Sequence, residues 1–227
     1  MNMLSNFKLV VFDMAGTTIN EDNLVYKALQ KVVTNAGFVC SLNDVLSICA
    51  GKEKKQAIID LLNSLNYSVP SIFISKLYED FILQLNDAYD SEPIFPCEGA
   101  INVFESLQAL NIKVVLNTGY NRATALQLLE KLNWKIGHQI NGLVTASDVT
   151  NSRPSPDMIY FAMQLFQIVD PKQVIKIGDS AIDILEGKNA GCGYSIGITT
   201  GAQTETELLS ANPDFVFSNL LELLPLL

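Results

Sequence analysis

The stretch that decides the fold is KLVVFDMAGTT, residues 8–18. From Leu9 to Phe12 every position is apolar, and the run stops at the carboxylate of Asp13. A short run that is apolar throughout is typical of a strand buried on both faces of a parallel sheet. A glycine-containing turn follows, which places Asp13 beside backbone N–H groups that suit a phosphoryl group. The same residues would also suit an ordinary turn at a strand end.

The pattern of a buried strand ending in a polar residue recurs along the chain. IKVVLNTG ends at Thr118, VIKIGD ends at Asp179, and shorter apolar runs occupy 194–198 and 214–217. Helical patterns over 99–110, 121–132, 156–166 and 181–190 separate these runs. This alternation predicts an α/β fold with a doubly wound, Rossmann-like parallel sheet. Because the carboxyl ends of parallel strands share one edge, Asp13, Thr118 and Asp179 are expected there together.

The stretch between the first two strands breaks this rhythm. Its four segments, at 25–37, 42–51, 52–65 and 71–89, have apolar residues three and four positions apart, as amphipathic helices do. The sequence therefore predicts a helical cap domain over 22–95, inserted after the first strand. The α/β core would comprise residues 1–21 and 96–227.

Composition excludes several classes of function. The chain has 227 residues, with 24 acidic and 15 basic side chains and a net charge of −9. So few basic residues argue against a nonspecific nucleic-acid binder and against a protein bound to an anionic membrane surface. The four cysteines are far apart and form no CxxC pair, so we expect reduced, buried thiols in a cytoplasmic protein.

Further polar residues at the predicted sheet edge suggest chemistry. In GDSAID, Asp179 and Asp183 are four residues apart at the start of a helix, where helix capping is the alternative explanation. Three converging carboxylates are unfavourable unless a cation lies between them, and hard oxygen ligands favour Mg²⁺. Thr118 and Gly119 offer a hydroxyl and an amide, and Arg153 offers a fixed positive charge for a phosphate.

Taken in order, these four motifs resemble those of the haloacid dehalogenase superfamily over essentially the whole chain. DMAGTT, TGYNR, an arginine before Pro154, and the segment 174–191 resemble most closely the phosphonatase-like family, named after phosphonoacetaldehyde hydrolase. The resemblance implies a hydrolase acting on a small phosphonate or phosphorylated substrate. It also implies a homodimer formed through the cap.

The resemblance further implies a role for each motif residue. Asp13 would be the nucleophile and would form an aspartyl-phosphate. Mg²⁺ would be bound by Asp13, Asp179 and the carbonyl of Ala15, with Asp183 supporting the metal site indirectly. The residues that bind the phosphate would be Met14, Ala15, Thr118, Gly119 and Arg153.

Ala15 is the most informative of these residues. Phosphatases of the superfamily carry an aspartate there, which protonates the leaving group, and such acid catalysis contributes about 10²–10⁴-fold. Phosphonatases instead use a cap lysine that forms an imine with the substrate aldehyde. In the segment 49–58, CAGKEKKQAI, Lys54 follows Gly51 by three residues, as in that family. Lys52, Lys55 or a dry pocket would lower its pKa. A lysine-rich helix start is otherwise usually a solvated face.

Two departures from the family leave the substrate open. Phosphonatase has a methionine where this chain has Ala50, and a histidine where it has Ala57. The first hypothesis is therefore a Mg²⁺-dependent hydrolase of phosphonoacetaldehyde or a close relative. The second is a small phosphomonoesterase resembling phosphoglycolate phosphatase. The third, ranked last, is a phosphate-binding module without turnover.

Overall fold

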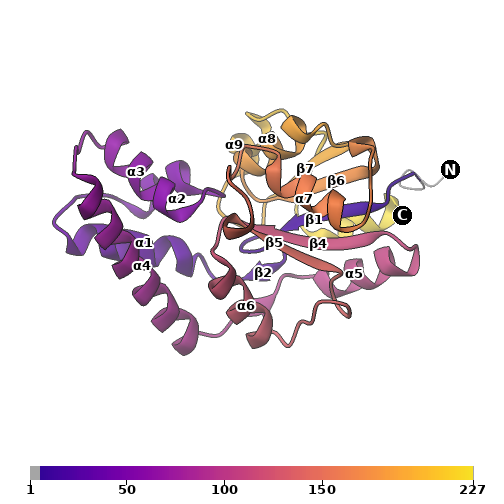
Figure 1. The fold of residues 1–227 in the computed structure, drawn as a ribbon, viewed down its shortest axis with the longest axis horizontal. Helices are drawn as coiled ribbons and strands as arrows, with labels where there is room; N and C mark the ends of the chain where they lie inside the picture. Colours follow the sequence, from indigo (N-terminus) through magenta and orange to yellow (C-terminus); the bar gives the residue numbers. More distant parts are fainter. Residues whose placement is uncertain (1–5, 227) are drawn as a thin grey trace.

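A parallel sheet of six strands forms the centre of the computed structural model, which describes residues 6–226 (Figure 1). The strands, in spatial order, are β5 (Gly142–Thr145), β4 (Lys113–Thr118), β1 (Leu9–Asp13), β6 (Val174–Gly178), β7 (Tyr194–Ile198) and β8 (Phe215–Phe217). The predicted α/β fold is confirmed. β5 was not predicted, because its sequence GLVT has only two consecutive apolar side chains, Leu143 and Val144.

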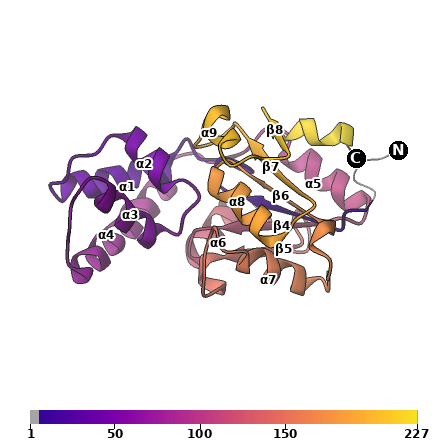
Figure 2. The ribbon, with the colours of Figure 1, turned by 90° about the horizontal axis from the view of Figure 1, so that it is seen from above.

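Helices cover both faces of the sheet (Figure 2). They are α5 (Ala100–Ala109), α6 (Arg122–Lys131), α7 (Asp157–Leu165) and α8 (Ala181–Ala190), followed by the short α9 (Glu205–Leu209). Alternate residues of β1 serve the two faces. Val10 and Phe12 belong to the apolar cluster that includes α5, whereas Leu9 and Val11 pack with α7. The central strand is therefore buried on both sides, as its unbroken apolar run predicts.

A lobe of four helices is inserted after the first strand. The helices are α1 (Leu24–Asn35), α2 (Leu42–Cys49), α3 (Lys54–Ser64) and α4 (Ser71–Ser91). We call residues 24–91 the helical lobe; it lies beside the carboxyl end of the sheet (Figure 1). The chain enters and leaves it through β2 (Ile19–Asn20) and β3 (Phe95–Pro96), which pair antiparallel.

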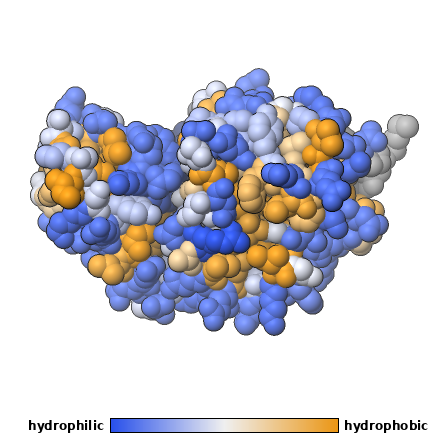
Figure 3. Space-filling view, in the orientation of Figure 1, coloured by the Kyte–Doolittle hydropathy of each residue, from blue (hydrophilic) through white to orange (hydrophobic). Residues whose placement is uncertain are grey.

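The face of the molecule shown in Figure 3 is mostly polar, with scattered apolar patches and a notch between the helical lobe and the core. Within residues 6–226, no helix combines the length and apolarity needed to cross a membrane. The four cysteines are free and buried, as expected for a reduced protein.

Candidate active site

The carboxyl ends of three neighbouring strands bring the first candidate residues together. β1 lies between β4 and β6, and Asp13 is opposite Asn117, one residue before Thr118. Asp179 follows β6 directly. All three candidates are buried, with Asp13 5% exposed, Thr118 3% and Asp179 2%. Burial raises the pKa of Asp13, although the charge of Arg153 opposes this shift.

Arg153 reaches this edge from the segment before α7. Its Nη1 atom lies 2.7 Å from Asp13 Oδ1 and 2.9 Å from Asp183 Oδ1. Nε donates to Glu186 Oε2 at 3.0 Å, and Nη2 donates to the side chain and the carbonyl of Asn117 at 2.6 and 2.8 Å. Burial alone would lower the pKa of Arg153, but Asp183, Glu186 and Asp13 raise it above its usual value. The guanidinium is thus a fixed cation beside Asp13.

The sequence analysis did not identify the buried polar residues that fix the position of the Arg153 side chain. Glu186 of α8, Asn117 of β4 and Lys176 of β6 are completely buried. Asn117 Nδ2 donates to both carboxylate oxygens of Glu186, at 2.9 and 3.0 Å, and Lys176 Nζ donates to Asn117 Oδ1 at 3.0 Å. One signal was available, because a lysine in the otherwise apolar run VIKIG must find a buried partner.

Asp183 differs from what the sequence argument assumed. Three converging acids were expected to require a metal ion, yet protein cations already neutralise Asp183. Its Oδ1 atom accepts from Lys176 Nζ at 2.7 Å, Arg153 lies 2.9 Å away, and the Ser180 hydroxyl donates to Oδ2. These cations outweigh burial and lower the pKa of Asp183. The unsatisfied charge at the site therefore belongs to Asp179.

Asp179 lacks a basic side chain within 4 Å in the part of the chain that the structure describes. Burial and the charges of Asp13 and Asp183 hold its pKa well above the usual range. Its Oδ2 atom accepts from the amide of Ala202 at 2.6 Å, in a loop after β7 that sequence reasoning did not identify. The Thr200 hydroxyl of that loop donates to the carbonyl of Gly16 at 2.6 Å. The loop therefore fixes Asp179 against the turn that follows Asp13.

The donor set fits a divalent cation such as Mg²⁺. Within residues 6–226 no group of three or more His, Cys, Asp or Glu side chains has a metal-binding arrangement. Two carboxylates and a main-chain carbonyl are nevertheless hard oxygen ligands of the kind Mg²⁺ binds together with water and phosphate oxygens. The mutual repulsion of Asp13 and Asp179 is what such a cation would relieve.

Three amides of the turn after Asp13 are already hydrogen-bonded within it, and they are not among the residues that the resemblance assigned to the phosphate. The amides of Gly16, Thr17 and Thr18 donate to main-chain carbonyls within the turn. The phosphate donors predicted there are thus limited to the amides of Met14 and Ala15. Gly16 has a φ of +82°, and a Cβ atom there would lie 2.4 Å from Asp179 Oδ2, so this position requires glycine.

Lys54 is the first residue of α3, and it is buried, only 5% exposed. A solvated helix face is therefore wrong for Lys54. Its Nζ atom donates to the carbonyl of Lys52 at 2.8 Å and lies over the rings of Tyr26 and Tyr120, 5.4 and 5.5 Å from their centroids. Burial lowers the pKa of Lys54, and the charge of Asp13 opposes this shift. A dry pocket, rather than the neighbouring lysines, is the cause.

Two glycines allow the helical lobe to close over the site. The carbonyl of Gly51 lies 3.4 Å from Arg153 Nη1, and a Cβ atom on Gly51 would lie 2.3 Å from the Ser180 hydroxyl. A Cβ atom on Gly119 would lie 2.6 Å from the carbonyl oxygen of Lys52. The backbone of the loop at 51–52 therefore touches the core directly, which keeps water away from Asp13 and Lys54.

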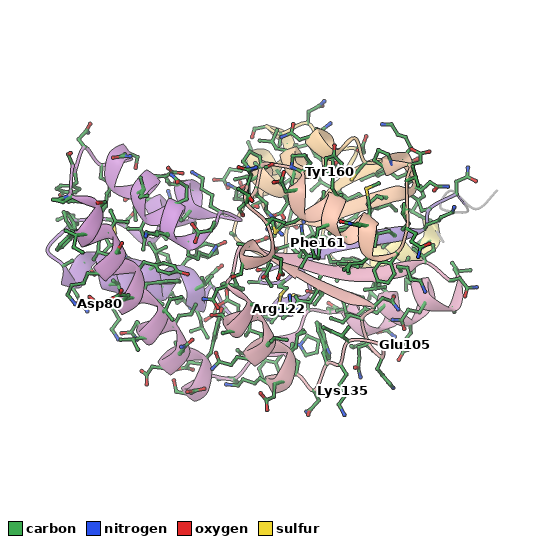
Figure 4. The ribbon with its side chains drawn as sticks, viewed as in Figure 1. Asp80, Glu105, Arg122, Lys135, Tyr160 and Phe161 are labelled. Atoms are coloured by element: carbon green, nitrogen blue, oxygen red, sulfur yellow. The ribbon has the colours of Figure 1, made fainter. Side chains whose placement is uncertain are left out.

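A cleft of about 840 Å³ opens outside this contact, where Figure 3 shows the notch. Its walls come from the helical lobe and from the core, including Lys52, Gln56, Arg153 and Leu185. On the opposite side α4 meets α6, where Gln127 Nε2 donates to Asp90 Oδ1 at 2.9 Å. Figure 4 shows Arg122 of α6 near this boundary and Asp80 farther out on α4. The cleft leads to Arg153, while Asp13 and Lys54 lie behind the loop.

A parallel α/β core, an acidic strand edge and an inserted helical lobe together define a class of hydrolase. The family model of the haloacid dehalogenase-like hydrolases matches residues 10–198 of the sequence. The chain belongs to this family, as its motifs predicted. It is 29% identical to phosphonoacetaldehyde hydrolase of Latilactobacillus sakei over 201 residues, covering 83% of this chain and 74% of that protein. It is 25% identical to pyrophosphatase PpaX of Bacillus mycoides, covering 96% and 95%.

Solved structures share the fold at lower identity. A hydrolase from Pseudomonas syringae has a TM-score of 0.86 at 21% identity, with 96% of each chain covered. A phosphonoacetaldehyde hydrolase-like protein from Oleispira antarctica has a TM-score of 0.83 at 22% identity, covering 96% of this chain and 90% of that one. A predicted phosphoglycolate phosphatase from Haemophilus somnus has a TM-score of 0.79 at 19% identity, covering 97% of each.

Proposed function

We propose that this chain hydrolyses the carbon–phosphorus bond of a small phosphonate that carries an aldehyde, most simply phosphonoacetaldehyde. One observation carries the proposal: Lys54 is buried between two tyrosine rings, in electrostatic reach of Asp13, while position 15 is alanine. The names of several relatives, including the one from Latilactobacillus sakei, agree with this substrate. Residues 22–95 would act as the cap, and 1–21 with 96–227 as the catalytic core.

In this proposal Asp13 is the nucleophile that attacks phosphorus. Arg153, Thr118 and Gly119, with the amides of Met14 and Ala15, would bind the phosphoryl oxygens. Mg²⁺, held by Asp13, Asp179 and the Ala15 carbonyl, would neutralise negative charge on the transferring group. Asp183 would support that site indirectly, since it orients Arg153 at 2.9 Å. Fixed positive charges are the main source of catalysis in phosphoryl transfer.

Lys54 would supply the chemistry that the missing aspartate does not. Its neutral amine attacks the aldehyde carbon, loss of water leaves an imine, and the imine nitrogen takes up a proton. When Asp13 bonds to phosphorus, the electrons of the breaking carbon–phosphorus bond move into the imine and give an enamine. Protonation of the enamine and hydrolysis release acetaldehyde and the free lysine, and water then cleaves the aspartyl-phosphate. Burial lowers the pKa of Lys54, which increases the fraction of the neutral amine that the first step requires.

Borohydride reduction during turnover tests the proposal directly. With phosphonoacetaldehyde present, reduction should place an ethyl group on Lys54, which mass analysis would locate. Lys54→Ala should abolish turnover, whereas Lys55→Ala, on the exposed side of the same helix turn, is the matched control. Full turnover without any adduct on Lys54 would eliminate imine chemistry.

A second candidate is a small phosphomonoesterase. Ala50 and Ala57 stand where phosphonatase has methionine and histidine, which favours a different substrate. Substitution of Ala15→Asp distinguishes the two functions, because it supplies the missing acid. A gain in phosphomonoester hydrolysis of about 10²-fold or more would favour the second candidate.

A further inference from the structure

A buried polar cluster that the proposed reaction does not use lies beside Lys54. We call Glu21, Tyr26, Tyr89 and Tyr120 the Glu21 cluster. None of these four residues is more than 4% exposed. They come from different parts of the chain, since Glu21 lies in the linker after β2, Tyr26 in α1, Tyr89 in α4 and Tyr120 just after β4. A carboxylate and three hydroxyls at this depth must each find a hydrogen-bond partner.

The hydrogen bonds within the cluster form one continuous chain. Glu21 Oε2 accepts from the amide of Val25 at 2.9 Å and from the Tyr89 hydroxyl at 3.2 Å. The hydroxyl oxygens of Tyr89 and Tyr120 are 2.7 Å apart. Since Tyr89 donates its proton to Glu21, its oxygen accepts from Tyr120. These hydrogen bonds connect the linker, the helical lobe and the core, and they hold the Tyr120 ring in place.

The end of this chain determines where the Lys54 ammonium lies. Its Nζ atom is 5.5 Å from the centroid of Tyr120 and 5.4 Å from that of Tyr26, within the range of a cation–π contact. Tyr26 is held separately, because its hydroxyl accepts from the amide of Gly51 at 3.2 Å. Within residues 6–226 no carboxylate forms an ion pair with Lys54 within 4 Å. The two rings and the Lys52 carbonyl are thus its immediate restraints.

We infer that Glu21 is a positioning residue for Lys54, acting through the hydroxyls of Tyr89 and Tyr120 rather than by contact with the lysine. Loss of these hydrogen bonds would free the Tyr120 ring and allow the Lys54 amine to turn away from the site. The inference rests on the proposed role of Lys54 as a nucleophile toward carbonyl groups. Packing alone would not call for a carboxylate here, since burying a charge is unfavourable.

Reductive labelling with acetaldehyde and borohydride tests this inference without any phosphonate. Mass analysis would give the ethylation of Lys54 relative to that of exposed Lys55. Tyr89→Phe and Glu21→Ala should each lower this ratio by about 5-fold, the effect of one lost hydrogen bond. Glu21→Gln keeps an acceptor oxygen for both donors and should retain the ratio. Tyr67→Phe, a partly buried tyrosine elsewhere in the helical lobe, is the matched control.

The outcomes separate this inference from the proposed function. An unchanged ratio in Tyr89→Phe, or a wild-type Lys54 that is not labelled, would overturn the positioning role. Tyr89→Phe removes a single oxygen atom, so it tests the positioning role even if Glu21→Ala does not fold. If labelling follows the predicted order while Lys54→Ala still turns over phosphonoacetaldehyde, the proposed function fails and the positioning role stands.

Discussion

Arg153 Nη1 lies 2.7 Å from Asp13 Oδ1, although 140 residues separate the two in sequence. The parallel sheet makes this contact, because it brings the end of β1 and the segment before α7 to one edge. The ion pair keeps a cation beside the carboxylate in a place where both groups are buried.

Asp13→Asn should abolish turnover, with a loss of at least about 10³-fold in kcat, because an amide cannot serve as the nucleophile. Phosphate release from phosphonoacetaldehyde measures the effect. Asp80→Asn is a matched control, since Asp80 also pairs with a basic side chain, Lys76, but on the exposed surface of α4 in the helical lobe. Normal activity in Asp13→Asn would sink the proposed function.

Arg153→Lys should lower both stability and activity, because one ammonium cannot replace a guanidinium that contacts several groups. Glu186 would lose one of its donors, Arg153 Nε at 3.0 Å, which should reduce the free energy of unfolding by about 2 kcal/mol. Urea unfolding measures the loss. Arg122→Lys, at an exposed pair, should change stability by less than about 0.5 kcal/mol. Equal effects in the two variants would contradict the importance of the buried contacts.

Asp179→Asn should raise the melting temperature in the presence of a chelator, because burial and two nearby acids oppose ionisation of this carboxyl. In wild type, Mg²⁺ at about 100 times its dissociation constant should add roughly 5–10 °C. The variant should lose this increase, and Asp80→Asn, on the exposed surface of α4, should keep it. A Mg²⁺ response that survives in Asp179→Asn would remove Asp179 from the metal site.

Glu21 should make the stability of the protein depend on pH. Burial raises its pKa from 4.5 to about 7, so between these values the unfolded chain releases a proton that the folded chain keeps. The free energy of unfolding should therefore fall as pH rises through this window, by up to about 3 kcal/mol. Glu21→Gln should remove this fall, so the variant should gain on wild type between pH 4.5 and 8. A constant difference in urea unfolding across that range would contradict the shift.

The sequence predicted the position of the strand-end residues well, because apolar runs that end at a polar residue are local features. Asp13, Thr118 and Asp179 each end or follow a continuous apolar strand, so their shared edge followed from strand topology. β5 was not predicted because it has only two consecutive apolar side chains, Leu143 and Val144. The sequence also did not predict which helices of the helical lobe pack against one another.

The partners of Arg153 and Lys54 could not be predicted in the same way. Glu186 and Glu21 occur in ordinary polar surroundings in the sequence, and only long-range packing buries them. The hydrogen bond between Tyr89 and Tyr120 joins α4 to the loop after β4, which no local spacing encodes. For Asp183 the sequence predicted a charge in need of a metal ion. That prediction overlooked Lys176, which neutralises Asp183 from a strand that was interpreted as apolar.

The pairing of β2 with β3 has an evolutionary consequence. Residues 19–20 and 95–96 lie side by side, so the two connections of the helical lobe to the core leave the core at one place. Lengthening, shortening or exchanging that appendage leaves the hydrogen-bond register of the main sheet intact. The proposed phosphorus chemistry of the strand edge and the proposed role of Lys54 in the helical lobe can thus change separately in evolution.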